Sequence, residues 1–340
     1  VVAMGALATE VVARVRVAGQ LTVVGITGSN GKTTTKNLVA TMCEQVGPTV
    51  FPRDSFNNEV GAPITMLKIT EDTRYLVLEL GASGKGHISR LPDKVPPDIA
   101  VVLMVGLAHA GEFGGVDVTV ESKRELVESL GSEGVTILNV DAPRVMSMES
   151  AAPGKVITFG HNPSAVRVSD IVSSISGTDF ELLSPLGHAH VSFKVLGEHH
   201  AMNAAAAAAV ALELGFDLDL IVSSLQSVTR AEHWRMELMG GNGVTVINDA
   251  YNASPDSMAA ALKTLRQVAG PENRTIAVLG EMAELGEYAG EEQDNLALLI
   301  VRLGIDQLVV VGDGARRLHI SAINEGSWDG ESKFYSTPDE

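Results

Sequence analysis

The stretch Leu21–Thr35 reads LTVVGITGSNGKTTT, and the fold around it follows from these residues. The apolar residues at its start are typical of a buried strand, and the glycines that follow are typical of a tight turn. The residues at its end are typical of the start of a helix. Such a turn directs backbone N–H groups and a helix N-terminus at phosphate, while Lys32 adds a positive charge and Thr33 a hydroxyl for Mg²⁺. We therefore expect a nucleoside triphosphate here. Gly25 lies six residues before Gly31, one more than in the common phosphate loop, so the loop is a modified one.

The alternative for this stretch is a glycine-rich hairpin with no ligand. A lone Gly-Lys-Thr would be weak support for phosphate binding. The preceding strand, the glycines at 25, 28 and 31, and the helix start together favour phosphate over the hairpin.

Composition narrows the class of protein. A length of 340 residues suggests two or three domains. The net charge of −17 argues against nucleic acid or an anionic membrane as partner, since both require positive patches. The single cysteine, Cys43, excludes an intrachain disulfide, fits a reducing compartment and is expected to be a small core residue. No stretch is apolar enough to span a bilayer, and Val1–Val17 has its charges at the wrong end for a signal peptide. We expect a cytoplasmic monomer.

Short apolar runs alternate with helical stretches, which predicts an α/β fold with a mostly parallel sheet. The expected strands are Leu21–Ile26, Tyr75–Leu80, Ile99–Met104, Val135–Val140, Arg235–Leu238, Val244–Asn248, Thr275–Leu279 and Gln307–Val311. The expected helices include Val1–Val17, one starting near Met202, one from Gly215 to Val228, Pro255–Val268 and Glu291–Leu303. The alternating residues 156–195 predict an antiparallel section, and the last third predicts a second parallel α/β unit. We place domains at residues 1–20, 21–228 and 229–340.

Three polar residues follow or lie near the expected strands. Glu79 ends one strand, and a carboxylate buried there would need a partner or a metal, although it could also reach solvent. His109 follows the next strand, where a metal or phosphate role and a purely structural role are about equally supported. Lys123 lies on an expected helix among charged residues, and side-chain chemistry alone favours a solvated helix face.

The segment 248–257, read NDAYNASPDS, joins an expected strand to an expected helix. Ser254 is suited to cap that helix, with Pro255 in its first turn. Capping leaves Asp249 and Asn252 unexplained, and these two side chains are expected to reach a ligand.

Together these motifs resemble those of the Mur ligases, the ATP-dependent amide-forming enzymes of bacterial peptidoglycan synthesis. The phosphate loop carries the resemblance, with three further segments: FNNEVGAP at 56–63, DAYNASPDSM at 249–258 and LGEMAELG at 279–286. These segments favour the family members that add D-alanyl-D-alanine to UDP-N-acetylmuramoyl-tripeptide. The resemblance covers nearly the whole chain. It implies a central P-loop-type ATPase domain and a Rossmann-like C-terminal ligase domain.

The resemblance also implies roles for single residues. The loop would wrap the ATP phosphates with Gly28, Ser29, Asn30, Gly31, Lys32, Thr33 and Thr34. The metal ions at the γ-phosphate would be held by Thr33, Glu79, His109 and Lys123, the last as a carbamate. ATP would also meet Asn203 near the adenine, and Arg235, Asp249 and Asn252 from the C-terminal domain. The catalytic set would be Lys32, Lys123, His109 and Arg235. For Lys123, we therefore follow the family resemblance and expect a metal-binding carbamate, although side-chain chemistry alone favours a solvent-exposed lysine.

The implied reaction has two steps and uses ATP and Mg²⁺. A carboxylate of the UDP-linked tripeptide attacks the γ-phosphorus to give an acyl phosphate. The amino group of D-alanyl-D-alanine then attacks the carbonyl, and phosphate leaves. Cations are needed where carboxylate and phosphate meet, and closure of the C-terminal domain would complete the site.

Some residues depart from the family pattern. Leu103-Met104 stand where Thr-Asn is usual, Ala110 follows the histidine, Arg124 lies beside the lysine and Ser254 replaces Asn. The UDP-binding N-terminal domain is represented only by a first helix and the C-terminal domain is shortened, so we expect ATP binding with poor ligation. The rivals are a related ligase such as a folylpolyglutamate synthase, a non-catalytic ATP-binding relative, and a phosphate-loop kinase.

Overall fold

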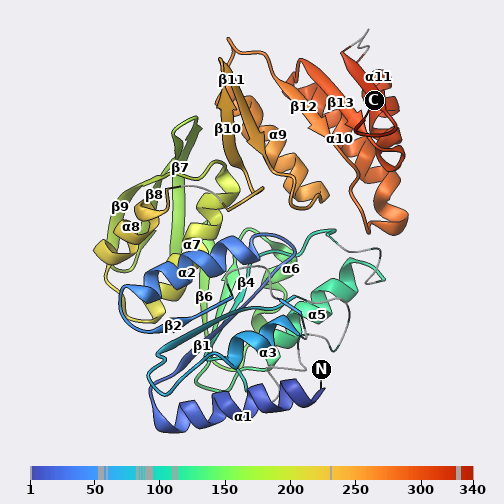
Figure 1. Ribbon diagram of the computed structural model, residues 1–340. Helices are drawn as coiled ribbons and strands as arrows, with labels where there is room; N and C mark the ends of the chain where they lie inside the picture. Colours follow the sequence, from blue (N-terminus) through green and yellow to red (C-terminus); the bar gives the residue numbers. More distant parts are fainter. Residues whose placement is uncertain are drawn as a thin grey trace.

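The computed structural model describes residues 2–52, 57–58, 60–81, 84, 86, 88, 95–108, 111, 114–229, 232–326 and 331–339 (Figure 1). The helices are α1 (Val2–Ala18), α2 (Lys32–Glu44), α3 (Gly61–Met66), α5 (Val116–Glu128), α6 (Pro143–Met146), α7 (Glu198–Glu213), α8 (Leu218–Ser227), α9 (Pro255–Ala269), α10 (Ala289–Leu303) and α11 (Arg316–Gly326), with short 3-10 turns η1 (Glu149–Ala151), η2 (Gly286–Tyr288) and η3 (Asp313–Ala315).

The strands form three sheets. The largest, called the central sheet here, has nine strands in the order β2-β3-β1-β4-β5-β6-β7-β8-β9. They are β1 (Thr22–Thr27), β2 (Thr49–Val50), β3 (Tyr75–Glu79), β4 (Ile99–Val102), β5 (Val135–Asn139), β6 (Lys155–Gly160), β7 (Val166–Ser174), β8 (Gly177–Ser184) and β9 (Gly187–Phe193). All neighbours from β2 to β7 pair in parallel, and β8 and β9 pair antiparallel. The expected mostly parallel α/β fold is confirmed.

Helices cover both faces of the central sheet, and the sequence of β1 explains why. Alternate side chains of a strand point to opposite faces. Val24 and Ile26 pack in the cluster that contains α2, α7 and α8, whereas Val23 packs in the cluster that contains α1, α3 and Leu126 of α5. Because both faces are buried, the strand needs apolar residues throughout, which is why it reads as an unbroken hydrophobic run.

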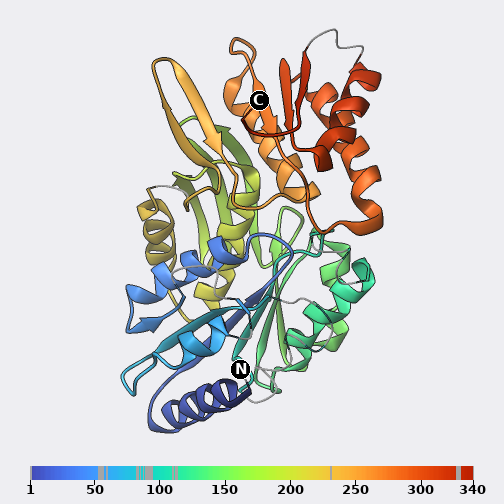
Figure 2. The same ribbon diagram turned by 45° about the vertical axis from the view of Figure 1, so that its right-hand side comes forward.

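Helix α7 lies at the centre of one of these layers. Its alanines, Ala204 to Ala209, are each 0% exposed, so the helix is buried on all sides. Figure 2 shows it running between α2 and the central sheet. Small side chains let a helix approach its neighbours closely, and the alanine run therefore serves packing as well as helix propensity. The helix begins at Glu198, four residues before the expected start at Met202, because polar residues at 198–200 and 203 conceal its first turn.

Enlarging this helix should destabilise the protein. We expect Ala206→Leu to lower the free energy of unfolding by about 1–3 kcal/mol, since added methylenes have no room in a close-packed layer. Ala13→Leu, at an exposed position of α1, is the matched control and should change it by less than about 0.5 kcal/mol. Denaturant titration of both variants measures the difference. Equal midpoints would contradict this view of α7.

The C-terminal elements form two smaller sheets. The strands β12 (Ile276–Leu279), β13 (Gln307–Val311) and β14 (Ser332–Tyr335) pair in parallel, with α10 and α11 packed beside them. The strands β10 (Glu237–Gly241) and β11 (Val244–Asn248) form a separate antiparallel hairpin. The expected second parallel α/β unit is confirmed for β12–β14, whereas the expected strands within residues 235–248 form this antiparallel hairpin instead. Asn242 and Gly243 both have positive φ, the requirement of a two-residue hairpin turn, so this Asn-Gly pair is the signal that was overlooked.

The bounds of the other expected strands and helices agree with the structure within about three residues. Residues 166–193 form the expected antiparallel section, although β6 pairs in parallel with β5 and with β7. Cys43 is fully buried in the core, and burial raises its pKa to about 12, so its thiol is inert. Among the described residues, no helix combines the length and apolarity needed to cross a membrane.

Candidate functional site

The loop between β1 and α2 has the geometry of an anion-binding turn. Gly31 is the N-cap of α2 and has φ +83°, a conformation that side chains rarely tolerate. A Cβ at Gly31 would also lie 2.3 Å from Asn203 Oδ1. The first helical bond joins Thr35 N to Gly31 O at 2.9 Å, so the backbone amides before it have no partner within the helix. This end of α2 is therefore suited to bind phosphate.

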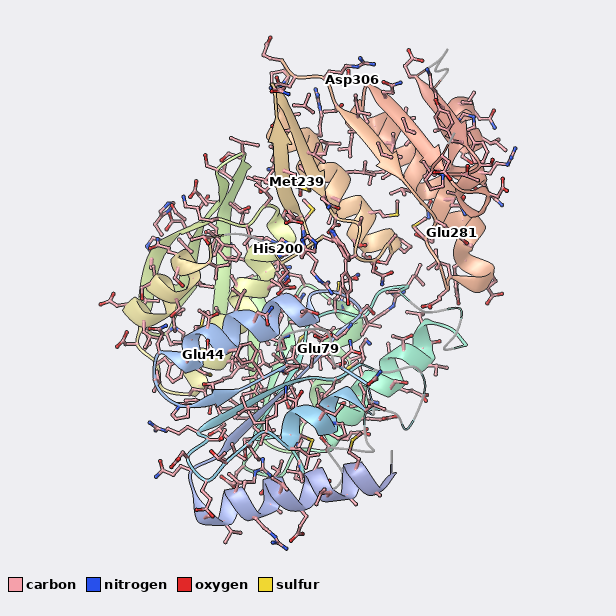
Figure 3. The ribbon with its side chains drawn as sticks, in the orientation of Figure 1. Glu44, Glu79, His200, Met239, Glu281 and Asp306 are labelled. Carbon is pink, nitrogen blue, oxygen red and sulfur yellow. The ribbon has the colours of Figure 1, made fainter. Side chains whose placement is uncertain are left out.

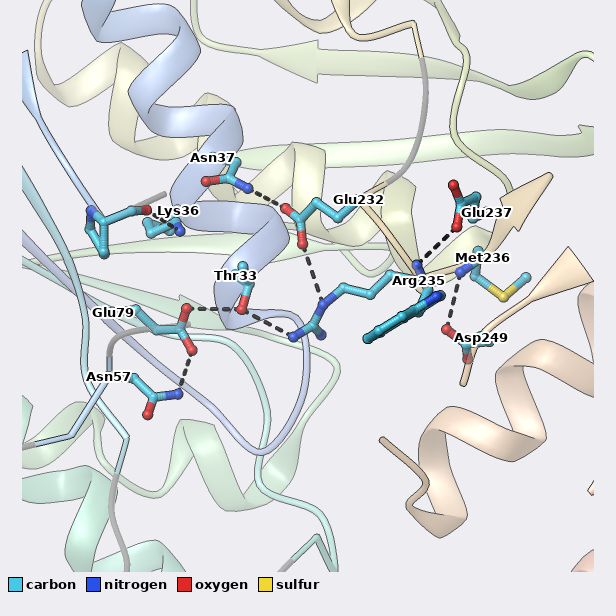
Figure 4. A network of polar contacts seen from close by, with 12 residues as sticks. Thr33, Lys36, Asn37, Asn57, Glu79, Glu232, Arg235, Met236, Glu237 and Asp249 are labelled. Carbon is cyan, nitrogen blue, oxygen red and sulfur yellow. Dashed lines mark hydrogen bonds and ion pairs between the residues drawn. The ribbon is translucent and has the colours of Figure 1, made fainter. Parts of the chain in front are cut away.

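Glu79 lies beside this loop at the carboxyl end of β3, and it is only 1% exposed. Thr33 Oγ1 donates to Glu79 Oε2 at 2.9 Å, and Asn57 Nδ2 donates to Glu79 Oε1 at 2.7 Å (Figure 4). The carboxylate is thus buried and held at both oxygens, which excludes the solvent-facing alternative. Asn57 was noticed in the sequence only as part of a motif, and its contact with Glu79 was not foreseen.

Two lysines, Lys32 and Lys123, lie beside the same loop. Lys32 Nζ donates to Gly28 O at 2.8 Å and to Ser29 O at 3.3 Å, so its ammonium group folds over the loop. Burial lowers the pKa of Lys32, and the negative charge of Glu79 opposes that effect. Lys123 on α5 is 4% exposed. Burial lowers the pKa of Lys123 to about 7, helped by the positive charge of Lys32. The solvated helix face that side-chain chemistry favoured was wrong, because the charged run conceals one buried position.

Arg235 contacts Thr33 from the C-terminal part of the chain. Its Nη2 lies 3.3 Å from Thr33 Oγ1, and its guanidinium stacks over the ring of Tyr251 with 4.0 Å between guanidinium carbon and ring centroid. Its Nε also lies 3.4 Å from Glu232 Oε2. Arg235 precedes β10 in the chain, so a residue next to the C-terminal sheets contacts the first turn of α2 (Figure 4).

Further residues of the C-terminal part face the loop. Asp249 Oδ1 accepts from Met236 N at 3.1 Å, and burial raises the pKa of Asp249 to about 6. The side chain of Asn252 accepts from Ala253 N at 2.9 Å. Ser254 caps α9 through a capping box with Ser257, as expected, and its Oγ also accepts from Asn30 Nδ2 at 3.2 Å. Ser254 therefore links the phosphate loop to α9, a contact that its capping role alone did not predict.

Two histidines open α7 near Asn203, one turn further along that helix. The rings of His199 and His200 stack with centroids 4.2 Å apart. Burial lowers the pKa of His199 to about 4 and that of His200 well below its usual value, so both rings are neutral at pH 7. Neither ring nitrogen of His200 has a hydrogen-bond partner among the described residues. Figure 3 labels both His200, on α7, and Glu79, at the end of β3.

Most of these groups line one cavity of about 910 Å³, although Ser254 and Glu232 do not. It is open to solvent and is bordered by the phosphate loop, the ends of β3 and β4, α5, the start of α7 and the β10–β11 region. Of the predicted site residues, it brings together Gly28, Ser29, Asn30, Gly31, Lys32, Thr33, Thr34, Glu79, Lys123, Asn203, Arg235, Asp249 and Asn252. His109 lies outside the described residues.

Comparison with known proteins shows the family to which the chain belongs. Residues 26–211, more than half of the chain, match the Mur ligase middle domain, and residues 234–339 match the Mur ligase glutamate ligase domain. The chain belongs to the Mur ligase family. The resemblance seen in the phosphate loop and in the three further segments is thereby confirmed.

Individual relatives narrow the comparison. The chain is 43% identical over 334 residues to a UDP-N-acetylmuramoyl-tripeptide--D-alanyl-D-alanine ligase of Mycobacterium tuberculosis, covering 96% of this chain and 65% of that protein. The crystal structure of MurF from Acinetobacter baumannii matches with a TM-score of 0.89 and 32% identity, covering 98% of this chain and 71% of that one. MurF from Thermotoga maritima, solved with ADP, gives a TM-score of 0.85 at 25% identity, with 99% and 74% covered. This Mur ligase chain therefore spans slightly less than two thirds of its mycobacterial relative.

The donor atoms of this Mur ligase fit a magnesium ion. The Thr33 hydroxyl and the Glu79 carboxylate are hard oxygen donors, 2.9 Å apart and buried at the end of the phosphate loop. Within the described ranges, no group of three His, Cys, Asp or Glu side chains is arranged to hold a metal ion. Mg²⁺ commonly takes only one or two protein ligands and completes its shell with phosphate oxygens and water. Thr33 and Glu79 therefore suit Mg²⁺ that arrives with a nucleotide.

Proposed function

We propose that this Mur ligase chain catalyses the ATP-dependent addition of D-alanyl-D-alanine to UDP-N-acetylmuramoyl-tripeptide. The observation that carries the proposal is the single cavity in which the phosphate loop, the Thr33–Glu79 pair and Lys123 meet Arg235. The names of its relatives supply the substrates. A cytoplasmic monomer that uses ATP and Mg²⁺ fits this activity.

The chemistry proceeds by two substitutions. An oxygen of the tripeptide carboxylate attacks the γ-phosphorus of ATP, the bond to the bridging oxygen breaks, and ADP leaves with the bonding electrons. The dipeptide nitrogen then attacks the carbonyl carbon of the acyl phosphate, phosphate leaves, and the nitrogen loses a proton. Both steps gather negative charge, so the site has to supply cations and exclude water.

The predicted site residues that line the cavity have distinct parts in this proposal. The amides at the start of α2 bind the phosphates, and Lys32, now folded onto Gly28 O and Ser29 O, turns its ammonium group to them. Arg235 brings a second cation from the C-terminal side. Thr33 and Glu79 hold Mg²⁺, which supplies positive charge to the phosphate oxygens when bound. Asn203, Asp249 and Asn252 contact the nucleotide from the cavity wall.

Lys123 has a chemical property that suits carbamylation. Only a neutral amine attacks CO₂, forming an N–C bond and releasing a proton. Because the pKa of Lys123 is about 7, a large fraction is neutral at neutral pH, unlike an exposed lysine. A carbamate would turn this buried cation into a carboxylate facing the site, adding a further oxygen ligand for Mg²⁺.

Ligation assays with the 340-residue chain test the proposal. We expect phosphate release, however slow, to require ATP, Mg²⁺, the UDP-linked tripeptide and D-alanyl-D-alanine together, with an amide product of the matching mass. Glutamate should not replace the dipeptide. Release with glutamate alone as the amine would indicate a related ligase of different specificity, and release without any acceptor would reject the acyl-phosphate route.

A further inference from the structure

Glu232 is a partly buried carboxylate to which neither the sequence motifs nor the proposed reaction gives a role. It lies in the segment between α8 and β10, three residues before Arg235. Its side chain is 24% exposed, and burial raises its pKa while the positive charge of Arg235 opposes the rise. A carboxylate is costly to bury unless its oxygens are engaged, so its partners indicate its purpose.

Both oxygens of Glu232 face partners in different parts of the molecule. Oε1 accepts from Asn37 Nδ2 on α2, and Oε2 lies 3.4 Å from Arg235 Nε (Figure 4). Asn37 lies one turn beyond Thr33 on the same helix, and Arg235 reaches Thr33 with its Nη2. Glu232 thus joins the guanidinium to the helix that carries the phosphate loop.

The backbone around Arg235 is strained, which shows that it is held in place. Trp234 and Met236, on either side of Arg235, have φ values of +59° and +53°, a region that bulky residues rarely occupy. Such strain persists only where surrounding contacts fix the chain. The described contacts include the bond from Met236 N to Asp249 Oδ1 on one side and the Glu232 carboxylate on the other.

We propose that Glu232 is a positioning residue, whose carboxylate, anchored on Asn37, holds the Arg235 guanidinium against the phosphate loop. Arg235 is then already in place when the triphosphate arrives, and its charge is not lost to solvent. The inference rests on the proposed function, in which Arg235 meets the nucleotide. Preorganising a charged group in this way raises affinity by removing the cost of ordering it on binding.

Affinity for a non-hydrolysable ATP analogue with Mg²⁺, measured by calorimetry, tests the proposal without requiring ligation. We expect Glu232→Gln to raise the Kd by roughly 5- to 20-fold, since it removes the charge on one partner of a partly buried ion pair while keeping the shape. Asn37→Ala, which leaves the ion pair but frees the carboxylate, should have a smaller effect in the same direction. Glu213→Gln is the control, because Glu213 pairs with Lys155 at the surface and not with the site.

The decisive comparison is made in a second background. If Glu232 acts through Arg235, then Glu232→Gln should leave the Kd of an Arg235→Ala variant unchanged. A loss of affinity of the same size in both backgrounds, or no loss in either, would overturn the inference. Thermal melting of each variant shows whether a lost affinity reflects unfolding. A wild-type chain that fails to bind the analogue would reject the proposed function as well, whereas tight binding that is insensitive to Glu232→Gln would reject the positioning role alone.

Discussion

Replacing Lys32 with methionine is expected to lower kcat/KM for ATP by roughly 10³-fold, the scale of losing a charged donor at a transition state. The ammonium group lies over Gly28 O and Ser29 O, inside the turn that should receive phosphate. Methionine is one atom shorter than lysine but keeps most of its unbranched, apolar length, and it removes the charge and the donors. The loss should therefore appear in chemistry and nucleotide affinity, and hardly in folding.

Steady-state ligation assays and thermal melting of Lys32→Met measure the two effects separately. Lys155→Met is the matched control, since Lys155 is exposed and forms an ion pair with Glu213. Its kcat/KM should stay within about twofold of the wild type because such surface pairs contribute little. If Lys32→Met ligates at the rate of this control, the phosphate loop is not where ATP reacts.

The sequence predicted the phosphate loop and the strands around it because local rules determine them. Residues 21–35 combine a doubly buried strand, a glycine with positive φ and a helix start, and each part follows from the residue types alone. Ser254 and Pro255 were recognisable as a helix start for the same reason. Glu79 could be placed at the site because the carboxyl ends of parallel strands meet at one edge.

The rest of the site depends on contacts between distant parts of the chain. Glu232 and Asn37 lie 195 residues apart in sequence, and Asn30 and Ser254 lie 224 apart. No spacing or periodicity reports such pairs. Burial also changes chemistry in a way that composition conceals, as for Lys123, which looks like one more charge on a helix. For Lys123, the family resemblance was more informative than side-chain chemistry.

Lys123→Met is expected to lower the kcat of ligation by roughly 10³-fold or more. It should at the same time raise the stability of the folded protein. Among the described residues, no hydrogen bond or ion pair engages the Lys123 ammonium group, which is 4% exposed and lies near the positive charge of Lys32. Replacing such a buried charge with an apolar side chain of similar volume should raise the free energy of unfolding by about 1–3 kcal/mol at pH 7. Loss of function with gain of stability is the mark of a residue kept for chemistry.

The pH dependence of this stability gives a second measurement. The folded pKa of Lys123, about 7, is lower than the ordinary 10.5, so between these values the unfolded chain binds more protons than the folded one. The free energy of unfolding of the wild type should therefore rise with pH between these two pKa values. Below about pH 7 the buried, charged Lys123 destabilises the folded protein to its full extent. Lys123→Met should remove that rise, whereas Arg124→Met, on the same helix, should keep it. Denaturant midpoints across the window, with isotope-labelled bicarbonate to detect a carbamate, test both claims. If Lys123→Met is less stable than the wild type at neutral pH, then Lys123 stabilises the folded protein, and the destabilisation inferred here is wrong.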